Sequence, residues 1–164
     1  MKFFFAILFT FVGLTSFSQA DTTVPYKRFP TLPPFQLLAL DSSSTITKEN
    51  LQKDKPVLIM FFSPDCDHCK HQVEDMLKDM SIFNDIQLVM ASFQPFEQIK
   101  AFNEKYQLAK YKNLYIGRDT KYFLPPFYRM YNLPYLALYN SKGDLITTFE
   151  GNVKPDKLKN AFNQ

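Results

Sequence analysis

At residues 57–69 the chain reads Val57-Leu58-Ile59-Met60-Phe61-Phe62-Ser63-Pro64-Asp65-Cys66-Asp67-His68-Cys69, an apolar run followed by a short turn and a Cys-x-x-Cys pair. The continuous apolar run is expected of a strand that is buried on both faces. The turn then opens a helix, so Cys66 is predicted at the helix N-terminus, where unpaired backbone N–H groups favour a thiolate. Because the thiolate is the nucleophile in disulfide exchange, this arrangement predicts a redox dithiol.

The same two cysteines, which are the only ones in the chain, could instead form half of a structural zinc site. Such a site needs two more ligands, usually a second Cys-x-x-Cys or a distant histidine pair. The only histidines, His68 and His71, lie in the same helical turn, and a four-ligand cage would need side chains on opposite helix faces. The sequence therefore favours redox chemistry without a metal or a cofactor, and zinc or copper binding is the alternative.

The helix after the turn carries a buried stripe at helical spacing, formed by Cys69, Val73, Met76, Leu77 and Met80. Cys69 is therefore expected to face the core, and His71 to be solvated. His68 lies between the cysteines, where a cation or a hydrogen-bond donor can stabilise a Cys66 thiolate. We predict that His68 tunes the ionisation of Cys66, with a bystander role as the alternative.

The first twenty residues have the pattern of a secretory signal. Lys2 precedes an apolar stretch over 3–14, and small and polar residues follow, ending in Ser18-Gln19-Ala20. The apolar stretch is short for a bilayer span, although an uncleaved membrane anchor is the alternative. We predict a signal peptide over 1–20, a flexible lead-in over 21–32 and one domain over 33–164, in a protein exported to the periplasm.

Composition and charge narrow the functional class. The 164 residues with 46% apolar content are enough for one domain with a core, and we expect a monomer. Removal of the signal would take away Lys2 and lower the net charge from +3 to +2, which gives no electrostatic case for binding DNA or other nucleic acid. A lone Cys-x-x-Cys closes too short a loop to stabilise an exported domain, so the pair indicates exchange chemistry.

Strands and helices alternate along the rest of the chain. Strands are predicted over 35–40, 57–62, 86–93, 113–116, 133–139 and 145–150, and helices after the cysteine turn to about residue 80 and over 95–106, 127–131 and 154–162. Thr47 is a candidate helix cap, residues 117–119 are a candidate turn, and residues 140–144 are the turn of a final hairpin. This order predicts an α/β fold, with a mixed sheet covered by helices on both faces.

These features resemble the thioredoxin fold: a buried strand, Cys-x-x-Cys on the following helix, and much later a strand that begins Leu133-Pro134-Tyr135-Leu136. Residues 33–37 with 46–51 look like the N-terminal hairpin and helix of the TlpA/ResA-like redoxins. Residues 86–116 look like the insertion that separates those redoxins from thioredoxin itself. The resemblance implies a thioredoxin-like fold with a redoxin-type N-terminal extension and a central strand–helix insertion.

The resemblance also implies roles for individual residues. Cys66 would be the attacking cysteine and Cys69 the resolving one. Pro134 would be a cis-proline that lies against the dithiol and, with Leu133, presents backbone groups to an extended substrate. Asp65 stands where the family usually has Trp, and Asp-His stands between the cysteines in place of Gly-Pro or Pro-Pro. The resemblance as a whole implies an exported thiol–disulfide oxidoreductase that acts on protein clients.

The direction of exchange follows from the same resemblance. TlpA/ResA-like proteins usually act as reductants fed from the membrane, which implies reduction of client disulfides with electrons from a membrane-bound donor. His68 also matches the histidine of DsbA-type Cys-Pro-His-Cys sites, so a disulfide-forming oxidase is an alternative. A redoxin-fold copper or zinc chaperone using Cys66, Cys69 and either histidine is another. A peroxiredoxin would need threonine at Ser63.

Overall fold

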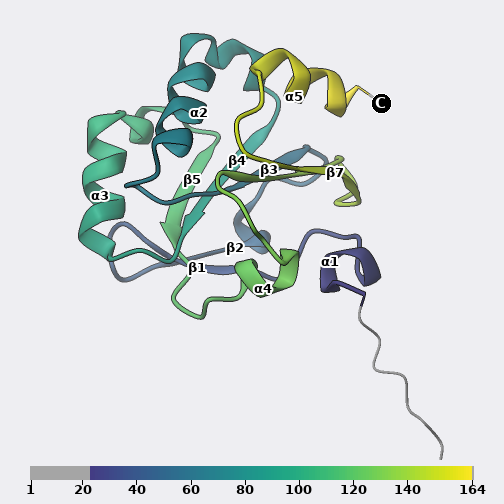
Figure 1. Ribbon diagram of the computed structural model, residues 1–164, viewed down its shortest axis with the longest axis horizontal. Coiled ribbons are helices and arrows are strands. Elements are labelled where there is room, and N and C mark those ends of the chain that lie inside the picture. The colour runs from purple at the N-terminus through teal and green to yellow at the C-terminus, as the bar shows by residue number, and fades with distance from the viewer. Residues whose placement is uncertain (1–22, 164) are drawn as a thin grey trace, which may run out of the picture.

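The computed structural model describes residues 23–163, and at its centre lies a mixed sheet with the strand order β2-β1-β5-β4-β3-β6-β7 (Figure 1). Strand β3 is parallel to β4, and β4 to β5, whereas the other neighbours are antiparallel. The predicted mixed sheet is thus confirmed. The strands are β1 (Gln36–Ala39), β2 (Thr45–Thr47), β3 (Val57–Phe61), β4 (Gln87–Ser92), β5 (Leu114–Arg118), β6 (Tyr135–Tyr139) and β7 (Leu145–Glu150).

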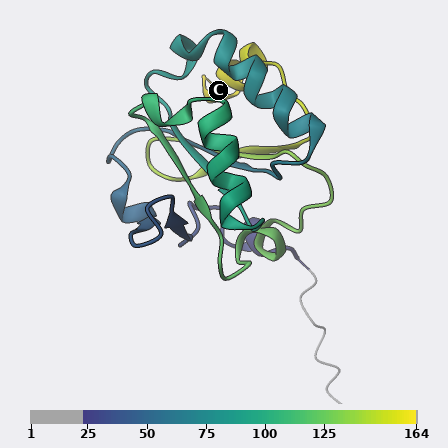
Figure 2. The same ribbon diagram turned by 90° about the vertical axis from the view of Figure 1, so that its left-hand side faces the viewer.

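Helices cover both faces of this sheet, as predicted. In Figures 1 and 2, α2, α3 and α5 lie on one side of the sheet, and α1 and α4 lie on the other. Thr47 is the N-cap residue of η1, in agreement with the sequence. The helices are α1 (Pro25–Arg28), α2 (Asp67–Lys78), α3 (Phe96–Lys105), α4 (Leu124–Tyr128) and α5 (Pro155–Phe162), with short 3-10 helices η1 (Lys48–Asn50), η2 (Met80–Phe83) and η3 (Leu108–Lys110).

Strand β3 shows why the sheet has a core on each face. Successive side chains of a strand point to opposite faces. Leu58 and Met60 pack in the core layer of α2, α3 and α5, and Val57, Ile59 and Phe61 pack in the layer of α4. All five side chains are buried. A central strand with a helix layer on each side needs such a continuous apolar run, and the strand ends just before the cysteine motif.

Residues 117–119 do not form the predicted turn. Gly117 and Arg118 are the last residues of β5, where they pair with Ala39 and Leu38 of β1. A Cβ atom at position 117 would lie 2.7 Å from the carbonyl oxygen of Leu38, so only glycine lets the two strands approach this closely. The prediction of a turn was wrong because this glycine marks a close contact between strands.

Helix α4 begins and ends earlier than the helix predicted over 127–131. Its first turn contains two prolines, where a missing N–H breaks no helical hydrogen bond. The buried carboxylate of Asp119 accepts hydrogen bonds from the backbone N–H groups of Phe123 (3.0 Å) and Leu124 (2.8 Å), which satisfies free donors at the helix start. Arg129 takes the left-handed conformation (φ 53°) and ends the helix.

The segment before β1 differs from the predicted loose lead-in over 21–32. Helix α1 in this segment lies against α4. Beyond α1, the backbone N–H of Leu32 donates to the carbonyl of Gly143 (2.8 Å), and that of Leu145 donates to the carbonyl of Pro30 (2.8 Å). The polar, proline-rich composition of this segment predicts a loose chain. In the structure, its last residues are instead hydrogen-bonded to the final hairpin.

The predicted signal peptide over 1–20 lies outside the described residues. Across the described range 23–163, none of the helices has the length and apolar character needed to cross a bilayer. Cleavage at Ala20 stays a prediction, and so does the domain boundary at residue 33.

Candidate functional site

Cys66 is the N-cap residue of α2, directly after the turn that leaves β3. Its Sγ atom accepts a hydrogen bond from the backbone N–H of Cys69 (3.2 Å) and donates a long one to the carbonyl oxygen of Leu133 (3.9 Å). A side chain at this position satisfies one of the free N–H groups of the first helical turn. A negative charge there is stabilised by about 0.3–1 kcal/mol. The predicted position of Cys66 at the helix N-terminus is confirmed.

Cys69 faces inward, as its place on the helical stripe predicts. Its side chain is 0% exposed and belongs to the core layer of α2, α3 and α5, whereas Cys66 is half-buried. Burial, and then the hydrogen bond with Cys66, raise the pKa of the Cys69 thiol well above its usual range. Cys69 is therefore protonated at neutral pH, and of the two sulfurs Cys66 is the one within reach of another protein.

Because the Cys69 thiol is buried, we expect the reduced protein to lose stability at alkaline pH. An unfolded cysteine has a pKa of about 8.5, and the native pKa of Cys69 is higher, so only the unfolded chain releases the proton in between. The stabilisation is fully present below about pH 8.5 and is lost as pH rises toward the native pKa. We expect the unfolding free energy to fall by about 1.4 kcal/mol per pH unit in that window.

Urea unfolding in the presence of a thiol reductant, from about pH 7.5 to 9.5, measures this slope. Cys69→Ala is the matched control, and this component of the slope should be absent from it. Burial also raises the pKa of Tyr128, and it raises that of Tyr139 to about 12, but unfolded tyrosines release protons only near pH 10. Equal slopes in the wild type and the variant would contradict the assignment.

Pro134 directly precedes β6 and follows Leu133, whose carbonyl oxygen lies 3.9 Å from Cys66 Sγ. The Leu133-Pro134 peptide bond is cis, as the resemblance to the redoxins implies. Pro134 is buried, and its carbonyl oxygen accepts a hydrogen bond from the backbone N–H of Gly151 (2.8 Å). Since the Leu133 carbonyl is also the acceptor for Cys66 Sγ, the structure brings the predicted substrate-binding pair to Cys66.

His68 is exposed and binds a segment from the far end of the sequence. Its imidazole Nδ1 lies 3.1 Å from Oδ1 of Asn152, and Nδ2 of Asn152 donates to the His68 carbonyl oxygen (2.7 Å). His71 is exposed as well, which agrees with its interpretation as a solvated residue. Asn152 was not predicted from the sequence as part of this site.

A buried contact joins the next turn of α2 to the same distant segment. The side chain of Gln72 is 0% exposed. Its Nε2 donates to the carbonyl of Val153 (2.9 Å), and its Oε1 accepts from the Val153 N–H (2.7 Å). This pair of hydrogen bonds fixes the cysteine helix against the segment between β7 and α5. Gln72 was likewise not predicted from the sequence as part of this site.

Two carboxylates flank Cys66 in the sequence, and Lys70 partly offsets them. The Lys70 ammonium lies 2.8 Å from the Asp67 carboxylate, and this hydrogen bond lowers the pKa of Asp67. Lys70 also donates to the backbone carbonyl of Asp65 (3.4 Å). Because the pair with Asp67 is largely exposed, solvent screens both the attraction and any repulsion that a Cys66 thiolate would feel.

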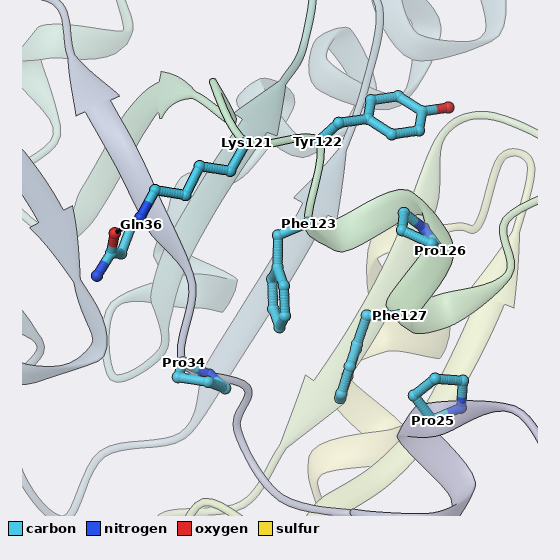
Figure 3. A pocket seen from close by; sticks show the side chains of 8 residues that line it. All are labelled: Pro25, Pro34, Gln36, Lys121, Tyr122, Phe123, Pro126 and Phe127. Carbon is cyan, nitrogen blue, oxygen red and sulfur yellow. Dashed lines mark hydrogen bonds between the residues drawn. The ribbon is translucent and has the colours of Figure 1, made fainter.

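Two pockets differ in their position relative to the dithiol. A pocket of about 570 Å³ has walls of prolines and aromatic rings from α1, the segment before β1 and α4, and Figure 3 shows the rings of Phe123 and Phe127 reaching into it. None of its lining residues belongs to the cysteine motif or to the cis-proline segment. A smaller pocket of about 220 Å³ lies between α2 and α3, and Pro64 and Asp65 are part of its wall. The smaller pocket is therefore the one that adjoins Cys66 in sequence.

The residues proposed as ligands in a copper or zinc chaperone are not gathered at one point. Among residues 23–163, no group of three or more His, Cys, Asp or Glu side chains is arranged to hold a metal ion. Cys69 is buried, His68 is hydrogen-bonded to Asn152, and His71 is exposed. The geometry gives no support to this alternative.

The part of the chain that contains this site matches a known protein family. A family model described as a thioredoxin-like domain matches residues 44–164. The chain belongs to the thioredoxin-like family. A sequence search against curated proteins finds no match. For this thioredoxin-like protein, family membership together with an intact Cys-x-x-Cys pair supports thiol–disulfide oxidoreductase activity.

Solved structures agree with the fold of the thioredoxin-like protein. A secreted disulfide oxidoreductase from Mycobacterium tuberculosis, homologous to E. coli DsbE, has a TM-score of 0.65 at 18% identity and covers 79% of this chain and 95% of its own. StoA from Bacillus subtilis has a TM-score of 0.59 at 20% identity, and the match covers 79% of this chain and 98% of StoA. A thiol:disulfide interchange protein from Chlorobium tepidum has a TM-score of 0.66 at 14% identity, and the match covers 88% of this chain and 97% of that protein. These likenesses confirm the thioredoxin-like α/β fold.

Proposed function

We propose that this protein is an exported thiol–disulfide oxidoreductase that reduces disulfides in client proteins. The observation that carries the proposal is the asymmetry of the cysteine pair. Cys66 is half-buried at the N-terminus of α2, and its sulfur accepts the N–H of a Cys69 that is fully buried. Such a pair suits one cysteine to attack a client and the other to resolve the product.

In the proposed reaction, the Cys66 thiolate attacks one sulfur of a client disulfide. A bond forms between Cys66 and that sulfur, the client S–S bond breaks, and the departing client thiolate takes up a proton. Cys69 then loses its proton and attacks Cys66 Sγ, which releases the second client thiolate to be protonated in turn. The client gains two electrons and two protons, and the protein keeps a disulfide between Cys66 and Cys69.

The client is proposed to bind along the Leu133-Pro134 segment. The Leu133 carbonyl lies 3.9 Å from Cys66 Sγ, so a client chain next to this segment would bring its own disulfide to the attacking sulfur. Backbone hydrogen bonds to an extended peptide depend little on its side chains. Recognition of this kind suits a protein that acts on disulfides in several sequences.

Brief alkylation of the reduced protein should label Cys66 much more than Cys69. Cys66 is partly exposed at the helix end, whereas Cys69 is 0% exposed and its pKa is raised by burial. Peptide mass mapping after a short treatment with iodoacetamide measures the ratio. The urea-unfolded protein is the control, in which both cysteines should react at similar rates. Preferential labelling of Cys69 in the folded protein would overturn the two roles.

We further propose that the protein works as a periplasmic monomer in the reducing direction, with electrons from a membrane-bound donor. The sequence pattern of residues 1–20 and the secreted relative from Mycobacterium tuberculosis support export. The resemblance to TlpA/ResA-like reductants supports the direction. Acid quenching of cells, followed by labelling of free thiols, reports the resting state of the pair. A resting dithiol is expected, and a resting disulfide would favour the disulfide-forming oxidase.

A further inference from the structure

Residues 150–153, which we call the bridging segment, connect the two halves of the candidate site. At its start, the Glu150 carboxylate accepts hydrogen bonds from the backbone N–H (3.1 Å) and the side-chain amide (2.9 Å) of Asn132. The N–H of Gly151 donates to the carbonyl of Pro134 (2.8 Å). These contacts hold the cis-proline segment, and the last two residues of the bridging segment bind α2. The bridging segment therefore sets the cysteine helix relative to the cis-proline segment.

The amide of Asn152 makes both of its hydrogen bonds to one residue, His68. Its contact with the His68 carbonyl oxygen (2.7 Å) requires a donor, so the amide nitrogen must lie there. The amide oxygen is then the atom that lies 3.1 Å from the imidazole Nδ1. An amide oxygen can only accept, so the proton in this second bond belongs to Nδ1.

We infer that Asn152 is a positioning residue that holds neutral His68 with its proton on Nδ1. The second ring nitrogen, Nε2, then carries the free lone pair. His68 is exposed and lies in the first turn of α2, between the two cysteines. Nε2 is therefore the one ring nitrogen of neutral His68 that can accept a proton, and the proposal extends to a proton that is taken up and returned there during exchange at the dithiol. This last step rests on the proposed function, whereas the assignment of the tautomer does not.

His71 supplies an internal control for this inference. It lies on the same helix and is exposed like His68, but within the described residues no hydrogen bond is formed to its ring. A neutral imidazole in water carries its proton mainly on Nε2. The two histidines of the chain should therefore show opposite tautomers, and the difference should depend on Asn152.

Long-range proton–nitrogen correlation spectra of the reduced, ¹⁵N-labelled protein would show the two tautomers. At a pH about two units above the ordinary histidine pKa, His68 should show a protonated Nδ1 and an unprotonated Nε2, and His71 the reverse. Asn152→Ala should make the His68 signals resemble those of His71 and leave His71 unchanged. A protonated Nε2 on neutral His68 in the wild type would overturn the inference.

The exchange rate with a small peptide disulfide tests the proton-transfer step. His68→Ala should slow the reaction by about a hundredfold or more, Asn152→Ala should slow it by less, and the double variant should be no slower than His68→Ala alone. Unchanged rates with the expected tautomer would overturn the role of Nε2. If the wild type reduces no disulfide, the proposed function fails, while the spectrum still decides the tautomer. Because Asn152 is exposed, the variants should fold as the wild type does.

Discussion

Replacing Cys69 with serine should reduce turnover to the uncatalysed background and leave client proteins covalently attached to Cys66. Cys66 can still attack a client disulfide in this variant, but a serine hydroxyl cannot displace the client from the mixed disulfide. Serine differs from cysteine by one atom, so the fully buried position should still be filled. Non-reducing electrophoresis, followed by mass spectrometry of the cross-linked peptides, would identify the adducts.

Cys66→Ser is the matched control for this trap. It should give neither turnover nor adducts, because the remaining Cys69 thiol is 0% exposed and is held protonated by its raised pKa. Addition of a thiol reductant should release the adducts formed by Cys69→Ser. Adducts on Cys69 in the Cys66→Ser variant, or no adducts with Cys69→Ser, would show that the cysteines do not have these roles.

Replacing Gln72 with leucine should lower the free energy of unfolding by about 2–6 kcal/mol. Gln72 satisfies both the N–H and the carbonyl of Val153, which is only 7% exposed, and leucine can satisfy neither. Each buried group left without a partner costs about 1–3 kcal/mol. Urea unfolding of the reduced wild type and variant would measure the difference.

Asn152→Ala is the control for this stability measurement. It removes two hydrogen bonds between the same pair of segments, but at an exposed position where water can replace them. Its loss should stay below about 1 kcal/mol. If Gln72→Leu cost no more than Asn152→Ala, the buried pair with Val153 would not be what fixes α2 to the bridging segment.

The parts of the fold that depend on local pattern could be predicted from the sequence. The continuous apolar run over 57–62 is typical of a strand that is buried on both faces. The spacing of Cys69, Val73 and Met76 places all three side chains on one face of a helix, which predicts that this face is buried. The turn at 140–144 between two apolar runs similarly predicted the β6–β7 hairpin. Each of these elements carries its own signal within a few residues.

Features that depend on contacts between distant segments were not predicted. Gly117 looks like a turn residue until β1 is placed against it, because the contact with the Leu38 carbonyl joins segments far apart in the chain. Helix α1 was missed for a related reason, since its four residues are too few to show a helical period and it lies against α4. In both places, tertiary packing decides what the local sequence leaves open.

The same distinction applies to the candidate site. Cys66, Cys69 and Pro134 could be found from motifs, whereas Asn152 acts through a segment that only the fold brings to α2. Gln72 did leave a signal, because it falls on the buried stripe between Cys69 and Val73. A buried amide needs hydrogen-bond partners, so a glutamine on that stripe indicates a partner elsewhere in the fold.

The electron balance between the reduced protein and insulin tests the exchange mechanism most directly. Free thiols on insulin and the Cys66–Cys69 disulfide would be counted after acid quenching, by alkylation and mass spectrometry. We expect two insulin thiols for each Cys66–Cys69 disulfide formed, and no lasting adduct in the wild type. Insulin thiols that appear without this disulfide, or a protein that keeps both of its thiols while insulin stays oxidised, would contradict the proposed chemistry.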